Sequence, residues 1–159
     1  MKTFLCVAIL IFIGFCQWFF SDFFSLGLFS PDVVFSACLT FAVLQTPVTA
    51  FLMCFIFGLY KDMLGSSLVG ANALVYTVVC YTILVVRKHF DFESFIPQLG
   101  LAFIMSVFSF ILYQLVSQVF TGAEPLKVSF LFIKPFLNAV IFPIVFAFIF
   151  SLFKHFKVQ

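Results

Sequence analysis

The sequence predicts an all-α membrane protein: a bundle of six transmembrane helices in a single domain, residues 1–159. The first observation is composition, because 65% of the residues are hydrophobic and only 9% are charged, whereas about a quarter of an ordinary soluble domain is charged. The second is that the apolar residues form continuous blocks, not the short alternating segments of a membrane barrel. The third is that the charges fall between these blocks, as expected for helices that cross a bilayer.

Six apolar blocks are expected to form the helices. They cover approximately residues 3–20, 31–45, 47–60, 70–86, 95–119 and 129–153. The first block follows Lys2 and could be read as a signal peptide, but it is followed by Gln17 and Trp18 without a small-residue cleavage pattern. We therefore predict an uncleaved first helix, with Trp18 as an aromatic anchor near a membrane interface.

The second and third blocks leave two membrane topologies open, because residues 31–60 form either two short helices or one helix kinked at Pro47. Cytoplasmic loops collect positive charge, and this rule favours two helices. Six spans with both termini in the cytoplasm place five cations inside and three outside, whereas five spans divide them four to four. The inner set is Lys2, Arg87, Lys88, Lys154 and Lys157, and the outer set is Lys61, Lys127 and Lys134.

Two helix starts carry local signals. Ser30-Pro31-Asp32 is typical of a helix N-terminus, because Ser30 can cap, Pro31 suits the first helical position and Asp32 faces the positive end of the helix dipole. The last membrane helix begins either near residue 129 or at Lys134-Pro135, where proline again suits the first turn and residues 126–133 would form an interfacial segment.

The third helix has a face of small residues. Ala50, Cys54, Gly58 and Asp62 recur every four residues and therefore share one side, which lets a neighbouring helix approach closely or forms a substrate groove. Asp62 lies at the C-terminal end of this helix, where the dipole disfavours an anion. We expect its carboxylate either to reach interfacial water or to accept hydrogen bonds from amides of the following Gly65–Gly70 turn.

No combination of residues predicts an enzyme, a metal site or a cofactor site. The five cysteines lie inside apolar blocks and are expected to pack as small hydrophobic residues. An aspartyl membrane protease stays open only if Asp32 and Asp62 share one water molecule. Other polar residues in the apolar blocks, among them Asn72, Tyr76 and Asn138, are expected to face the bundle interior and bond neighbouring helices.

A series of short motifs follows in order along the chain. It begins with Pro31-Asp32 at the start of an apolar helix and ends with Phe142-Pro143 in the last one. Between them lie Gly58-Leu59-Tyr60-Lys61-Asp62, Gly65, Gly70-Ala71-Asn72-Ala73-Leu74, Tyr81 and Phe136-Leu137-Asn138-Ala139. In this order the motifs resemble the MreD family of bacterial rod shape-determining proteins.

The resemblance implies a non-enzymatic inner-membrane component of the cell-elongation machinery, acting in cell shape and peptidoglycan synthesis. Its implied partners are a single-span MreC-like protein, cytoskeletal and peptidoglycan-synthesising proteins and membrane lipid, with no nucleic acid. It also implies a fold similar to the substrate-binding component of energy-coupling-factor transporters, so the alternative function is vitamin or micronutrient binding. We further expect the small-residue face of the third helix and the aromatic outer face to dock partner helices.

Overall fold

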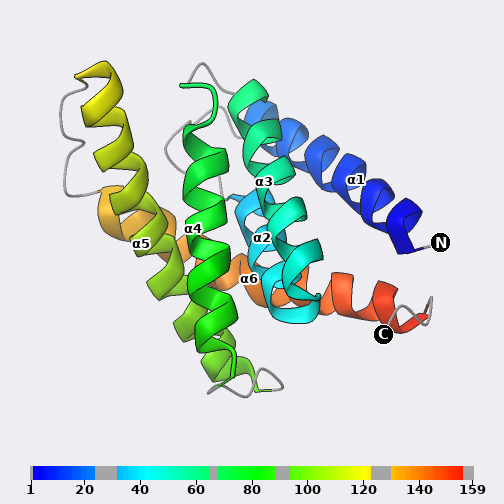
Figure 1. Cartoon of the computed structure of the whole chain (residues 1–159). Coiled ribbons are helices and arrows are strands. Elements are labelled where there is room, and N and C mark those ends of the chain that lie inside the picture. Colours follow the sequence, from blue (N-terminus) through cyan, green and yellow to red (C-terminus); the bar gives the residue numbers. More distant parts are fainter. Residues whose placement is uncertain (1, 24–31, 65–67, 89–93, 123–129, 156–159) are drawn as a thin grey trace.

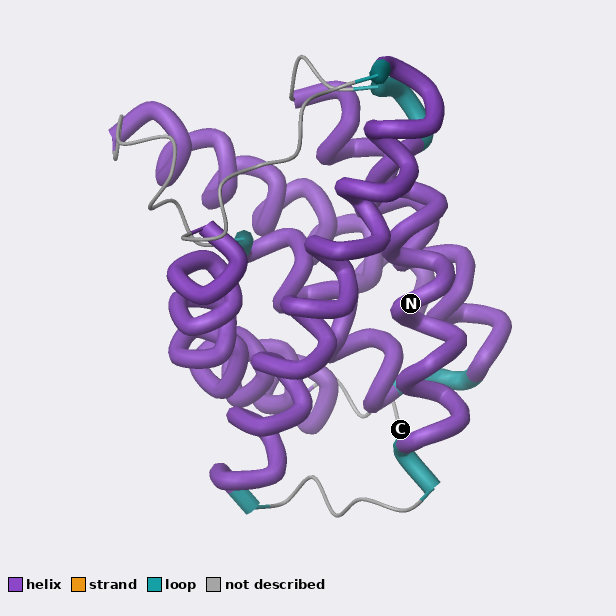
Figure 2. Tube along the Cα trace, turned by 90° about the vertical axis from the view of Figure 1, so that its left-hand side faces the viewer, coloured by secondary structure: helices purple, strands orange, loops and turns teal. Residues whose placement is uncertain are grey.

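The computed structural model describes residues 2–23, 32–64, 68–88, 94–122 and 130–155, which form six helices packed into one bundle (Figures 1 and 2). The helices are α1 (Lys2–Phe23), α2 (Val33–Leu44), α3 (Pro47–Leu64), α4 (Ala71–Val86), α5 (Phe95–Thr121) and α6 (Phe130–His155). Each predicted apolar block overlaps one of these helices, so the all-helical prediction is confirmed.

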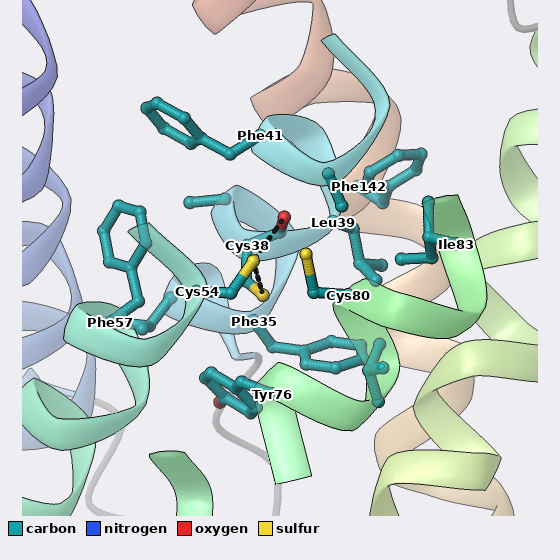
Figure 3. Packing of buried hydrophobic residues seen from close by; sticks show 14 of the residues in the cluster. Phe35, Cys38, Leu39, Phe41, Cys54, Phe57, Tyr76, Cys80, Ile83 and Phe142 are labelled. Atoms are coloured by element: carbon teal, nitrogen blue, oxygen red, sulfur yellow. Dashed lines mark hydrogen bonds between the residues drawn. The ribbon is translucent and has the colours of Figure 1, made fainter. Parts of the chain in front are cut away.

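Helix α2 lies at the centre of the bundle. Its sequence, VVFSACLTFAVL, is apolar on every side, and such a helix is expected to be buried. Its residues 33–42 are all buried, and the helix packs against α1, α3, α4 and α6. Figure 3 shows its side chains surrounded by those of three other helices, with Phe57 from α3, Tyr76, Cys80 and Ile83 from α4 and Phe142 from α6.

The break between α2 and α3 excludes a single kinked helix over residues 31–60. The chain leaves α2 at Gln45 in an extended conformation, with φ −101° and ψ 168°, and α3 starts at Pro47, a favoured first helical position. The two helices then pack against each other. Two separate helices, as predicted, therefore occupy this stretch.

The helices differ in their length relative to a membrane. Within the described residues, three stretches are long and apolar enough to cross one: Pro47–Leu64, Phe95–Thr121 and Ile133–His155. The apolar helices Val33–Leu44 and Ala71–Val86 are shorter. With 12 residues, α2 is about 18 Å long, compared with about 30 Å for a hydrocarbon core. Six membrane crossings stay a prediction, and the ends of α2 need polar partners inside the protein.

Helix α6 begins at Phe130 and continues through both Pro135 and Pro143. The helix thus starts near residue 129, and Lys134-Pro135 lies in its second turn; where α6 enters the membrane stays a prediction. Each proline lacks the amide that would bond to the carbonyl four residues before it. Helix α6 runs across the back of the bundle, behind α4 and α2 (Figure 1), and packs on α2 and α5.

The small-residue face of α3 packs inside the chain. Ala50, Cys54 and Gly58 are buried, and a Cβ atom added to Gly58 would lie 2.3 Å from the Cα atom of Ala73 in α4. On the α2 side, the Cys54 and Cys38 sulfurs are 2.7 Å apart (Figure 3). Helices α2 and α4 thus occupy the face that we expected to receive a partner helix, and a partner has to bind elsewhere.

Candidate functional site

Polar side chains from all six helices meet near the N-terminal ends of α2 and α4. We call this set the polar cluster: Gln17 of α1, Asp32 at the start of α2, Lys61 and Asp62 of α3, Asn72 and Tyr76 of α4, Ser106 of α5 and Asn138 of α6. Burying a polar group in apolar surroundings is costly unless it is hydrogen-bonded. The partners found here therefore decide whether the cluster stabilises the bundle or serves a ligand.

An ion pair and a tyrosine hydroxyl form one part of the polar cluster. Lys61 Nζ pairs with Asp32 Oδ2 and donates a hydrogen bond to the Tyr76 hydroxyl over 2.9 Å. The same hydroxyl donates to Asp32 Oδ2 over 3.0 Å. The side chains of Lys61 and Asp32 are only 30% and 17% exposed, so each charge depends on the other for compensation. The three residues join α3, α4 and the start of α2.

The first turn of α2 is capped by side chains from three helices. Asp32 Oδ1 accepts the Phe35 amide over 3.0 Å, so Asp32 itself is the N-cap, whereas the sequence suggested Ser30. Asn138 Oδ1 accepts the Asp32 amide over 2.8 Å, and Gln17 Oε1 accepts the Val33 amide over 2.9 Å. The first amides of a helix have no partner within that helix. These contacts therefore remove the free-energy cost of burying the amides without a hydrogen bond. Ser30 and Pro31 lie outside the described residues.

Asn138 extends this network to α5. Its Nδ2 atom donates to Ser106 Oγ over 2.8 Å, and both side chains are buried. One amide side chain thus uses its oxygen on α2 and its nitrogen on α5. The sequence predicted that Asn138 faces the interior but gave no indication of either partner.

Asp62 caps the N-terminus of α4. Its side chain is nearly inaccessible, at 1% exposure. Its Oδ2 atom accepts the amides of Gly70 over 2.9 Å and Ala73 over 3.3 Å, and Oδ1 accepts the Asn72 amide over 3.1 Å and the Asn72 side-chain Nδ2 over 2.7 Å. Of the two arrangements expected, Asp62 therefore adopts the amide-bonded one.

The position of Asp62 also explains how an anion is tolerated at the C-terminal end of a helix. The C-terminal end of α3 disfavours an anion, but the adjacent N-terminal end of α4 favours one. Gly70 reaches that end with φ +95°, a backbone conformation that glycine adopts without steric cost. Gly65, also predicted to belong to this turn, lies outside the described residues.

The opposite end of α2 is capped by Arg87, which the sequence assigned only to a loop. Its Nη1 atom donates to the carbonyls of Gln45 over 2.7 Å, Ala42 over 3.1 Å and Val43 over 3.5 Å. A cation is favourable at a helix C-terminus, where carbonyls lack internal partners. The short helix α2 therefore has a carboxylate at its start and a guanidinium from α4 at its end.

The geometry supports a structural role for both carboxylates. Asp32 accepts from an amide, a hydroxyl and an ammonium group, and Asp62 accepts four hydrogen bonds from α4. An aspartyl protease instead requires two carboxylates that share one water molecule. Within the described part of the chain, no three His, Cys, Asp or Glu side chains are grouped so that they could hold a metal ion.

The fold and the polar cluster define a class of protein: an all-helical bundle with an apolar exterior whose buried polar groups bind one another. The sequence matches the family model described as rod shape-determining protein MreD over residues 1–156. The chain therefore belongs to the MreD family of cell-shape proteins, and the resemblance predicted from its motifs is confirmed. Searches of curated proteins and of solved structures returned no match, so the expected similarity to energy-coupling-factor components stays a prediction.

Proposed function

We propose that this protein is a non-enzymatic inner-membrane component of the cell-elongation complex, which docks a single-span MreC-like partner. In this role it contributes to cell shape and peptidoglycan synthesis together with the cytoskeletal and synthetic proteins of the complex. The observation that carries the proposal is the internal pairing of the polar cluster, because Asp32, Lys61, Asp62 and Tyr76 all bond groups of the same chain. Contacts with other proteins then fall to the apolar exterior.

The proposed topology has six spans and cytoplasmic termini. It is supported by the antiparallel pair α3 and α4 (Figure 1), which has Lys61 at one end and Arg87 and Lys88 at the other. The positive-inside rule places the end with Arg87 and Lys88 in the cytoplasm. The polar cluster then lies toward the outer side of the membrane.

The outer face of α1 is the proposed docking surface for the partner helix. Helix α1 lies at the edge of the bundle (Figure 1) and packs mainly on α2 and α3. Its exposed aromatic side chains are Phe12, Phe15, Trp18 and Phe19. Helices in lipid associate through van der Waals contact, and aromatic rings offer a large contact area. This surface replaces the small-residue face of α3, which the chain itself covers.

Depletion of the protein in rod-shaped cells tests the function. Cells are expected to become round while vitamin uptake continues, because peptidoglycan synthesis is no longer directed along the cell length. Intact rods with failed uptake of a vitamin would contradict the proposal and favour the substrate-binding alternative. A plasmid copy of the wild-type gene, which should restore the rods, serves as the control.

A photoreactive amino acid at Phe15 tests the docking surface. This position is 61% exposed on α1, and crosslinking in cells is expected to capture a single-span protein. The matched control is Leu115, which is 53% exposed on α5. Absence of a protein adduct at Phe15, or equal capture at both positions, would contradict the assignment to α1.

A further inference from the structure

An apolar groove opens between the end of α2, the start of α5 and the second half of α6. Its volume is about 850 Å³, within the range of roughly 300–1,000 Å³ that is typical of ligand sites. Val43 of α2, Phe95 of α5 and Pro143, Ala147 and Phe150 of α6 line it, and Gln98 is its polar residue. None of these residues belongs to the polar cluster, so the groove is a separate feature.

The dimensions of the groove suit a lipid tail better than a partner helix. Along α6 it extends from Pro143 to Phe150, which corresponds to about 10 Å at 1.5 Å per residue. A spanning helix would follow the full hydrocarbon core of about 30 Å, whereas the acyl chain of one leaflet enters only part of that depth. The aliphatic and aromatic lining offers an acyl chain contacts without demanding polar partners.

Two positive features lie at the α2 end of the groove. Arg87 Nη1 donates to the carbonyl of Val43 over 3.5 Å, and Val43 lines the groove, so the guanidinium charge lies at this end. Helix α5 also begins here, at Phe95, with no side-chain cap from Ser94 and no acidic residue in its first turn. Its first amides lie at the positive end of the dipole and favour an anion.

We propose that this groove binds one anionic phospholipid, with an acyl chain between α5 and α6 and the phosphate beside Arg87 and the first amides of α5. Guanidinium groups recognise phosphate through charge-assisted hydrogen bonds. A zwitterionic lipid has the same phosphate but adds a cation that Arg87 repels. The expected preference for the anionic lipid is about fivefold, which corresponds to about 1 kcal/mol for one basic residue at the membrane surface. This site does not depend on the proposed docking function.

Native mass spectrometry of the whole protein tests the site with phosphatidylglycerol and phosphatidylethanolamine supplied in equal amounts. The wild type is expected to retain phosphatidylglycerol with about the fivefold preference derived above. Ala147→Phe should reduce the retained lipid severalfold, because the added ring fills the groove. Ala147 is exposed in the protein, so the ring need not enter the core. The matched control is Ala8→Phe, at an exposed alanine of α1, which should retain lipid like the wild type.

Equal retention of the two lipids by the wild type, or equal retention by the two variants, would overturn the proposal. A photoreactive amino acid in place of Ala147 gives a second readout that does not require a filled groove. A phospholipid adduct at this position supports the site. A polypeptide adduct, or the absence of any adduct, overturns it.

Discussion

The contact between α3 and α4 at Gly58 gives the sharpest stability prediction. In Gly58→Ala, the new Cβ atom would lie 2.3 Å from Ala73 Cα, 2.6 Å from Ala73 N and 2.8 Å from the Asn72 carbonyl carbon. All three are backbone atoms, so no rotation of a side chain can relieve the clash. The two helices have to separate, and Asp62, one turn further along α3, loses optimal distance to the amides of Asn72 and Ala73.

The cost follows from this geometry. Overpacking of a well-packed contact costs about 1–3 kcal/mol, and at roughly 2–4 °C per kcal/mol for a chain of this size the melting temperature should fall by several degrees. The matched control is Gly100→Ala in α5, where an added Cβ atom meets no atom within 4 Å. That change should preserve or raise stability, because alanine is favoured over glycine in a helix by about 0.5–1 kcal/mol.

The assay is thermal unfolding of both variants and the wild type in the same detergent, followed by loss of helical circular dichroism. Gly58→Ala should melt below the wild type and Gly100→Ala at or above it. Equal melting temperatures for the two variants would refute the reasoning, because they would mean that α3 and α4 do not approach closely at Gly58.

Three further predictions use the same assay. Asp32→Asn and Lys61→Met each leave a mostly buried charge unpaired and should each cost about 1–3 kcal/mol, and the double variant should cost less than their sum; additive losses would argue against the ion pair. Asp62→Asn directs an amide at donors of α4 that now bond Oδ2 and should cost about 1–3 kcal/mol, so an unchanged melting temperature would exclude the cap. Arg87→Met leaves carbonyls at the end of α2 unpaired and should lower the free energy of unfolding by a similar amount. The control Lys88→Met, at an exposed position, should lower it little. Equal stability of these two variants would contradict the capping of α2.

Continuous apolar blocks and local chemistry predicted much of the fold. Each of the six helices lies within a few residues of its predicted block, because continuous apolar runs separated by charges leave few other solutions in lipid. For the Asp62 carboxylate, the sequence left two arrangements, interfacial water or the amides of the following turn. Both follow from local features, because Asp62 lies at the end of its helix and a glycine-containing turn comes next in the sequence. Gly58 could be predicted to lie on a closely packed face because it follows Ala50 and Cys54 at a spacing of four residues.

The pairings across helices could not be predicted in this way. From the sequence, Lys61 and Arg87 were used only as cations that indicate the topology. In the structure, Lys61 pairs with Asp32, and Arg87 donates to carbonyls at the end of α2. These partners depend on how the helices cross, which no local pattern encodes. The same limit explains the small-residue face of α3, since spacing predicts that a helix can approach but does not identify which helix does so. The short second apolar block was the one available indication of these pairings, because the ends of a helix too short to cross the membrane need polar partners from other helices.

Native mass spectrometry of the protein extracted from its own membranes tests the docking proposal most directly. The predicted result is a complex in which the chain carries a single-span polypeptide and no water-soluble metabolite. The contradicting result is a chain that retains a tightly bound vitamin-sized molecule and no second polypeptide, because the polar cluster would then serve a ligand.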